Sequence, residues 1–121
     1  MSGYKIKFYQ KSVNGREPVL EYIEKLDAKN KAKVLKYIDF LLQHDGYLDE
    51  PYSKHIADKI RELRVDFSSK HHRIFYFVFI GKAIILLHAF LKNTAKTPRK
   101  EIDRALANYH DAIINKKTYE D

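Results

Sequence analysis

The sequence predicts a single α+β domain, and three observations support that fold class. The chain has 121 residues, which is enough for one hydrophobic core but not for two. Apolar residues make up 45% of it and aromatic residues 13%, so the chain should fold rather than stay disordered. The hydrophobic period changes along the chain in the order strand, helical hairpin, three-stranded antiparallel meander and C-terminal helix.

The first half of the chain predicts the strand and the hairpin. Apolar residues alternate with lysines over residues 4–8, which is typical of a strand with one wet face. The pattern becomes helical from Arg16, with Pro18 in the first turn. Residues 27–30 form a short corner, and a second helix follows that closes near Asp45-Gly46. Its lysines are interpreted as a solvated face, with RNA binding as the alternative: Lys29, Lys31, Lys33 and Lys36.

The second half predicts a loop over residues 47–59 and then three β-rich runs. These runs cover residues 60–67, 72–80 and 83–91. Gly81-Lys82 is predicted as a two-residue hairpin turn, because glycine supplies the positive φ that such turns need. Residues 68–71 make the other turn. Both faces of the central run are apolar, so each face should be covered.

The last helix is predicted to begin with Thr97 as its N-cap and Pro98 at its first position. Residues 116–121 are interpreted as a flexible tail, which leaves residues 1–115 as the folded domain.

Composition narrows the class of function. Cysteine is absent, which removes disulfides and zinc-thiolate sites and fits the reducing cytoplasm. The first ten residues lack the apolar core of a signal peptide, and no apolar run approaches the roughly 20 residues of a membrane span. The net charge of +7 favours a polyanionic partner such as nucleic acid, although many basic proteins bind none.

Strand alternation predicts which side chains share a face. A two-residue turn at 81–82 places Arg73 opposite Phe90, and an even turn at 68–71 places Arg64 opposite Phe75. One face then carries Glu62, Arg64, Asp66, Arg73, His88 and Lys92. The other face, expected to meet the helical hairpin, carries Leu63, Val65, Phe67, Ile74, Tyr76, Ile85 and Leu87.

Each polar residue of the first face also has a purely structural interpretation. Arg64 could pair with a neighbouring carboxylate. Arg73 could form a cross-strand ion pair with Asp66. His88 is by default a half-buried, hydrogen-bonded histidine, and His71-His72 lacks a third ligand at metal spacing. The convergence of several cations on one face favours a function. Because a cation that serves such a function must be accessible, we expect the Arg73 side chain to face solvent.

Three stretches together resemble a known family: PYSKHIADKIRELRV, HHRIFYFV and LLHAFLKNTAKTPRKEIDRA. They are similar to the phage-derived, HigB-like branch of the RelE/ParE toxin superfamily over residues 51–105. That pattern runs P-x-x-K-x-L, E-L-R, Y-R-x-x-Y and L-L-x-x-F-x-K-K-x-x-K-T-P, followed by a helix with E-I-x-x-A. Two positions depart from it: Asn93 replaces a common second lysine, and His72 replaces a common aromatic residue.

The resemblance implies a RelE-like fold and a cytoplasmic toxin of a type II toxin–antitoxin system. Such a toxin is an mRNA interferase, an endoribonuclease that uses no metal or cofactor and usually cleaves mRNA inside the ribosome. Its partners are mRNA, the ribosome and a small antitoxin, often a helix-turn-helix protein, with DNA contacted only through the antitoxin complex. Active-site positions match Arg64, Arg73 and Lys92. Substrate-binding lysines are expected at Lys54, Lys96 and Lys59.

The chemistry suits these residue types. The RNA 2′-hydroxyl can attack the adjacent phosphorus, so the protein must orient the strand, move protons and stabilise the charge that develops. Arginine forks fit phosphate oxygens. The base stays open: Lys92 comes first, followed by His88 and Glu62, although a lysine is ordinarily protonated at neutral pH. The alternatives are a gyrase-inhibiting ParE-like toxin and a non-catalytic RNA-binding or adaptor domain.

Overall fold

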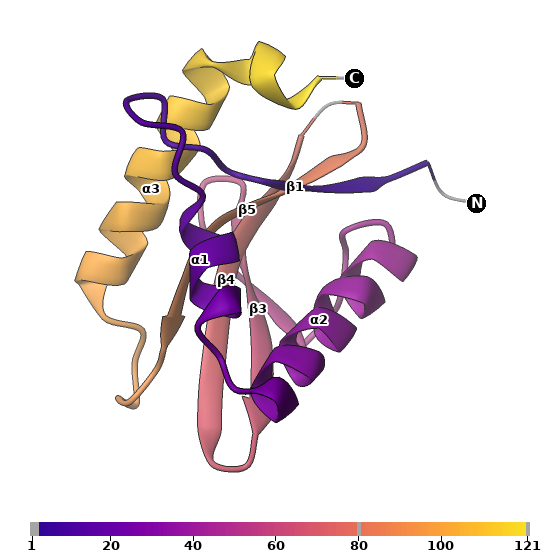
Figure 1. Ribbon diagram of the computed structural model, residues 1–121, viewed down its shortest axis with the longest axis vertical. Helices are drawn as coiled ribbons and strands as arrows, with labels where there is room; N and C mark the ends of the chain where they lie inside the picture. Colours follow the sequence, from indigo (N-terminus) through magenta and orange to yellow (C-terminus); the bar gives the residue numbers. More distant parts are fainter. Residues whose placement is uncertain (1–2, 80, 121) are drawn as a thin grey trace.

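A computed structural model describes residues 3–79 and 81–120 and shows a five-stranded sheet with helices on both faces (Figure 1). The strand order is β1-β5-β4-β3-β2, in which β2 to β5 form an antiparallel meander and β1 runs parallel to β5. The elements are β1 Lys5–Phe8, α1 Pro18–Glu24, α2 Ala28–Gln43, β2 Ser53–Ala57, β3 Ile60–Phe67, β4 Lys70–Phe79, β5 Ala83–Leu91, α3 Arg99–Ile114 and the short 3-10 helix η1 Lys116–Tyr119. The predicted α+β class is confirmed.

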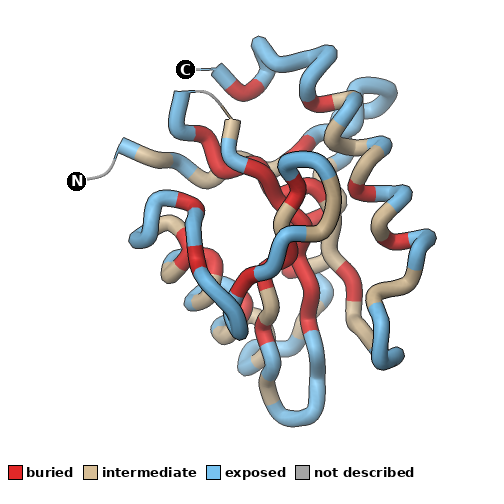
Figure 2. The backbone as a smooth tube through the Cα atoms, turned by 180° about the vertical axis from the view of Figure 1, so that it is seen from behind, coloured by how far each residue is buried: buried red, intermediate tan, exposed pale blue. Residues whose placement is uncertain are grey.

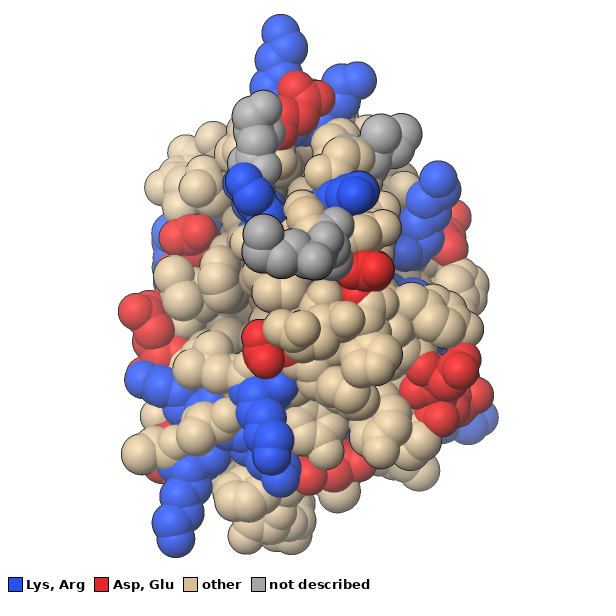
Figure 3. All heavy atoms as spheres, turned by 90° about the vertical axis from the view of Figure 1, so that its right-hand side faces the viewer, with Lys and Arg blue, Asp and Glu red and all other residues tan. Residues whose placement is uncertain are grey.

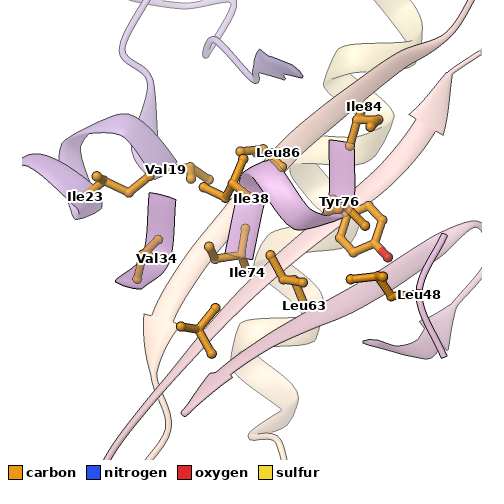
Figure 4. Packing of buried hydrophobic residues seen from close by; sticks show 12 residues of the cluster. Val19, Ile23, Val34, Ile38, Leu48, Leu63, Ile74, Tyr76, Ile84 and Leu86 are labelled. Atoms are coloured by element: carbon orange, nitrogen blue, oxygen red, sulfur yellow. The ribbon is translucent and has the colours of Figure 1, made fainter. Parts of the chain in front are cut away.

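Two hydrophobic clusters hold the helices against opposite faces of the sheet. α1 and α2 contribute Val19, Ile23, Val34, Ile38 and Leu41, which pack on strand residues such as Ile74 and Leu86 (Figure 4). α3 covers the other face through Ala105 and Ala112, against Phe75, Phe77 and Phe90. The central strands are accordingly buried along most of their length (Figure 2). The prediction that both faces of β4 are covered is confirmed.

The predicted loop at 47–59 is wrong in part, because Ser53–Ala57 form the edge strand β2, paired with β3. The segment reads SKHIA, and Lys54 and His55 in its middle are exposed. A short edge strand with charged side chains carries little of the apolar alternation on which a prediction depends. Ser53 is buried, and its hydroxyl lies 2.7 Å from that of Tyr76.

The turn between β3 and β4 is shorter than predicted. Phe67 pairs with Lys70, so only Ser68 and Ser69 form the turn, with φ angles of 50° and 64°. Positive φ at both central residues is the geometry of a type I′ hairpin. Arg64 therefore lies opposite Arg73 rather than opposite Phe75. The shift is an even number of residues, so every side chain of β3 stays on its predicted face.

The predicted two-residue turn at Gly81-Lys82 is wrong as well. Phe79 pairs with Ala83, and the predicted strand residue Ile80 lies outside the described residues. An offset of one residue moves each side chain at the start of β5 to the opposite face of the sheet. Ile85 and Leu87 therefore pack with α3 and not with the helical hairpin. A bulge then restores the predicted register.

The bulge is the reason that the register of the second half of β5 agrees with the prediction. Tyr76 pairs with Leu86 but Phe75 pairs with His88, so Leu87 is the extra residue. The backbone carbonyl of Leu87 accepts a hydrogen bond from the Asn108 side chain of α3 at 2.9 Å. This hydrogen bond satisfies a backbone carbonyl at the bulge, where the pairing between β4 and β5 is interrupted.

The last helix and the C-terminus also depart from expectation. α3 begins at Arg99 with Pro98 at the N-cap position, and Thr97 directs its hydroxyl elsewhere. Residues 116–119, predicted as part of a flexible tail, form η1. Tyr119 is 4% exposed, and its hydroxyl accepts a hydrogen bond from the Gln10 backbone at 2.9 Å. Among the described residues, no helix is both long and apolar enough to cross a membrane.

Candidate active site

Glu62 lies at the centre of a polar cluster on the α3 side of the sheet. The residue is 0% exposed, and both carboxylate oxygens are bonded. Oε1 accepts a hydrogen bond from Arg64 Nε at 3.1 Å, and Oε2 accepts one from the Thr97 hydroxyl at 3.0 Å. Burying an unpaired charge costs free energy. The Glu62 carboxylate therefore needs these hydrogen bonds, and they fix the positions of its neighbours. We call Glu62, Arg64, Asp66, Arg73 and Thr97 the arginine cluster.

Arg64 is the more open of the two arginines. Its side chain is 23% exposed, and Nε is held by Glu62. Nη1 lies 3.9 Å from the exposed carboxylate of Glu50. The end of the guanidinium is therefore oriented by the protein while part of it reaches the surface. That arrangement suits a bidentate contact to an anion.

Arg73 is buried, which makes the expectation of a solvent-facing cation wrong. Its side chain is 8% exposed, on the face of the sheet against which α3 packs. Nη1 donates to Asp66 Oδ1 at 2.7 Å and to the His72 carbonyl at 3.1 Å. Nε is buried without a hydrogen-bond partner among the described residues, and it lies 4.0 Å from Glu62 Oε1. The structure thus contains the Arg73–Asp66 ion pair considered from the sequence.

The two arginines lie directly opposite each other across β3 and β4. Like charges in that position repel, and Glu62 and Asp66 offset the repulsion. Partial burial would raise the pKa of Asp66, but hydrogen bonds from Arg73 and His71 outweigh it and hold that pKa below its usual value. The two carboxylates balance the two guanidiniums. Any excess positive charge here must come from lysines.

Two of the predicted lysines lie beside the arginine cluster. Lys54 of β2 is paired with Glu62 and exposed. Lys92, half-buried at the end of β5, donates its backbone N–H to the His71 carbonyl, which places its side chain on the face of Arg73. Lys96 is exposed in the loop between β5 and α3, at the rim. Lys59 lies apart, in the turn between β2 and β3.

His88 belongs to a second group on the same face of the sheet, with Phe75 of β4 between it and Glu62. Its Nε2 lies 2.8 Å from Glu101 Oε1 on α3, and Arg104 Nη1 lies 3.4 Å from the same oxygen. The rings of Phe75 and Phe90 flank it, at centroid distances of 6.3 Å and 5.9 Å. Burial lowers the pKa of His88, and the hydrogen bond to Glu101 opposes that effect without cancelling it. His88 is therefore a neutral ring at pH 7.

The sequence interpretation missed the residues that orient these side chains. The sequence predicts Thr97 as a helix cap, yet its hydroxyl donates to Glu62. Glu101 is 9% exposed and anchors His88 from the first turn of α3. Neither contact has a local signal, because each joins an element to a strand far away in the chain.

On the opposite face, His72 connects the sheet to both helices of the hairpin. It is 1% exposed, with Nδ1 2.7 Å from the Tyr22 hydroxyl of α1 and Nε2 2.8 Å from Asn30 Oδ1 of α2. An amide oxygen only accepts, so Nε2 carries the hydrogen and Nδ1 accepts from Tyr22. Asn30 is itself held by Asp27, the N-cap of α2. This histidine, a departure from the family pattern, thus has a structural role.

We expect His72 to make the fold less stable in acid. Burial lowers its pKa from the usual 6.5, Lys70 and Arg73 add to that effect, and Asp27 and Asp66 oppose it. The unfolded chain then binds more protons than the folded one below about pH 6.5, so stability is fully present above that pH and falls as the pH drops.

Urea unfolding at pH values from 7 to 5 measures this effect. His72→Phe should flatten the decline by at most about 1.4 kcal/mol per pH unit, the limit for one proton. His88 contributes in the same direction, so a residual slope is expected. The matched control is His110→Phe on the exposed side of α3, and equal slopes for the two variants would contradict the expectation.

In residues 3–79 and 81–120, no three His, Asp or Glu side chains gather in a way that could hold a metal ion. The structure instead brings hydrogen-bond donors together. The guanidiniums of Arg64 and Arg73 are held by carboxylates, and Lys54 and Lys92 lie on the same face. Such a site can bind and polarise a phosphate group.

Comparison with known proteins identifies the relatives of this chain. Residues 21–110 match the family model described as phage derived protein Gp49-like (DUF891). The chain is also similar to the "Probable endoribonuclease HigB1" of Mycobacterium tuberculosis, in both strain CDC 1551 / Oshkosh and strain ATCC 25618 / H37Rv. In each case the identity is 33% over 100 residues, which are 83% of this chain and 78% of the relative.

Proposed function

The chain belongs to the family of phage-derived Gp49-like proteins, and from that premise we propose that it is the toxin of a type II toxin–antitoxin system. Its activity is that of a RelE-like endoribonuclease that cleaves mRNA without a metal. The observation that supports this most directly is the pair of opposed arginines anchored by Glu62, beside Lys54 and Lys92. The naming of the HigB1 relatives as endoribonucleases supports the same activity.

In the proposed reaction the RNA itself supplies the nucleophile. The 2′-oxygen attacks the adjacent phosphorus and the bond to the 5′-oxygen breaks, which leaves a 2′,3′-cyclic phosphate and a 5′-hydroxyl. Arg64 binds the non-bridging oxygens, since its guanidinium is both oriented and partly exposed. Arg73 adds a fixed positive charge behind it. Both act on charge that grows as the phosphorane forms.

Proton transfer needs two further groups. The ammonium of a lysine is only a donor, which suits Lys92 to protonating the leaving 5′-oxygen. Glu62 is a poor base here, because it is fully buried with both oxygens bonded, and we assign it the role of anchor. His88 is neutral, and its bond from Nε2 to Glu101 leaves Nδ1 as an acceptor. We assign proton removal to His88.

The proposed partners follow from the same assignment. Lys54, Lys96 and Lys59 bind the RNA backbone as exposed cations, and the net charge of +7 suits binding to the ribosome. The toxin acts in the cytoplasm and is silenced by a cognate antitoxin with a helix-turn-helix fold. DNA is contacted only through the complex with that antitoxin.

Expression and cleavage experiments test the proposal. Inducible expression in a bacterium should arrest growth and shorten mRNAs, and co-expression with the adjacent antitoxin gene should relieve the arrest. The purified protein should cleave mRNA on ribosomes in the presence of EDTA. Soluble expression with normal growth and intact transcripts would overturn the proposal. Arrest with intact mRNA and altered DNA supercoiling would instead identify a gyrase inhibitor.

A further inference from the structure

A pocket lies on the hairpin side of the molecule, away from the arginine cluster. It is a pocket of about 370 Å³ between α2 and the segment that enters β2, within the usual ~300–1,000 Å³ of small-ligand sites. We call it the aromatic pocket, and its lining residues are Lys33, Lys36, Tyr37, Asp39, Phe40, Gln43 and Tyr52. None of the catalytic assignments above uses these residues.

Three aromatic rings surround this pocket without stacking on one another. The ring centroids of Tyr52 and Phe40 lie 5.4 Å apart at an interplanar angle of 88°, and those of Tyr52 and Tyr37 lie 6.4 Å apart at 55°. Tyr37 and Phe40 also meet edge to face, at 79°. The rings are therefore not stacked face to face, and Tyr52 is 41% exposed, so part of its surface is accessible to a further planar group.

Positive charge borders these rings. Lys33 Nζ lies 5.8 Å from the Tyr37 ring centroid and 5.4 Å from that of Phe67, so Lys33 packs on aromatic rings rather than standing freely in water. Lys36 is exposed almost one helical turn later. In the view from the α2 side, Lys and Arg side chains gather at the lower end, next to uncharged surface (Figure 3). Aromatic faces beside lysines are the combination that binds single-stranded nucleic acid.

The pocket is joined to the arginine cluster through the sheet edge. The backbone carbonyl of Tyr52 accepts a hydrogen bond from the Arg64 backbone N–H at 2.8 Å. The Arg64 side chain lies on the α3 face, whereas the Tyr52 ring contacts α2 on the other face. A strand of RNA bound at Arg64 therefore reaches Tyr52 by crossing the β2 edge, where Lys54 is exposed.

We propose that the aromatic pocket binds one unstacked base of the RNA strand, with the base lying on Tyr52. The identity of the ligand rests on the proposed ribonuclease function. Asp39 lines the pocket as well, and a carboxylate only accepts hydrogen bonds. The pocket therefore favours a base that donates an exocyclic amino group to Asp39, as cytosine, adenine and guanine can, over uracil, whose only donor is the ring N3–H.

Binding of uncleavable RNA tests this assignment independently of catalysis. Short 2′-O-methyl oligonucleotides lack the attacking hydroxyl, so fluorescence anisotropy can compare oligo(C) with oligo(U) at fixed salt. Tyr52→Ala should weaken oligo(C) binding by roughly 5- to 150-fold, the range for one lost base–aromatic stack, and Tyr52→Phe should retain it. Tyr47→Ala is the matched control, because Tyr47 is another exposed tyrosine of the same segment that does not line the pocket. Asp39→Asn should reduce the preference for oligo(C) over oligo(U).

The possible outcomes are separable. Binding that depends on Tyr52 supports the pocket even if the wild-type chain cleaves no RNA, which would overturn only the proposed activity. Equal affinities for Tyr52→Ala and Tyr47→Ala would overturn the pocket even if cleavage is confirmed. A Tyr52→Ala protein that binds RNA normally but loses its antitoxin would assign the pocket to a protein side chain, and that result also overturns the inference.

Discussion

Replacing Arg64 by glutamine should abolish most RNA cleavage while the protein stays folded. Glutamine keeps a donor near Glu62 but removes the guanidinium to which we assign the binding of phosphate oxygens. Losing one such donor to the developing charge lowers the rate of the chemical step by about 100- to 1,000-fold. Single-turnover cleavage at saturating RNA measures that step, since an interaction made only in the transition state appears there.

Arg61→Gln is the matched control for this experiment. Arg61 lies on the same strand but on the opposite face, where it donates to Ser53 Oγ and to the Leu48 carbonyl. The two variants lose the same charge, so nonspecific effects of charge on RNA binding are shared. Equal losses of rate for Arg64→Gln and Arg61→Gln, with both proteins folded by circular dichroism, would refute the role of Arg64.

Replacing Glu62 by alanine should destabilise the protein severely. Its carboxylate is fully buried and pairs with Arg64, Thr97 and, at 4.0 Å, Arg73, so alanine removes the hydrogen-bond partner of the partly buried Arg64 and one of the two carboxylates near the buried Arg73. Breaking a buried pair in this way costs about 3–5 kcal/mol, which is a large part of the ~5–15 kcal/mol that stabilises a typical domain. Urea unfolding at pH 7 gives the free energy directly.

Two further variants should lower the free energy of unfolding by smaller amounts. Thr97→Val removes one hydrogen bond to Glu62 and should cost about 1 kcal/mol. Glu50→Ala removes an exposed carboxylate 3.9 Å from Arg64 and should cost less than about 1 kcal/mol. If Glu62→Ala instead unfolds like the wild type yet cleaves no RNA, Glu62 is the base and not the anchor.

Most of the candidate site could be predicted because strand alternation has a period of two. Arg64, Arg73 and Lys92 share a face in the sequence interpretation and in the structure, although both turn lengths were wrong. The β3–β4 turn differs by an even number of residues, and the bulge at Leu87 compensates for the offset at Gly81-Lys82. Burial of Arg73 was not predictable, because strand alternation assigns a side chain to a face but does not say how deeply that face is covered.

The sequence by itself determined the order of the elements other than β2, the apolar faces of β3 and β4 that meet the helices and the set of cations on one side of the sheet. These features depend on local period and spacing, which neighbouring residues encode directly. Only the tertiary structure decided that Thr97 holds Glu62, that Glu101 holds His88 and that Tyr52 meets the rings of α2. Each of these contacts joins residues at least twelve positions apart. These contacts form because packing of the helices on the sheet brings two surfaces together, and no local sequence pattern predicts them.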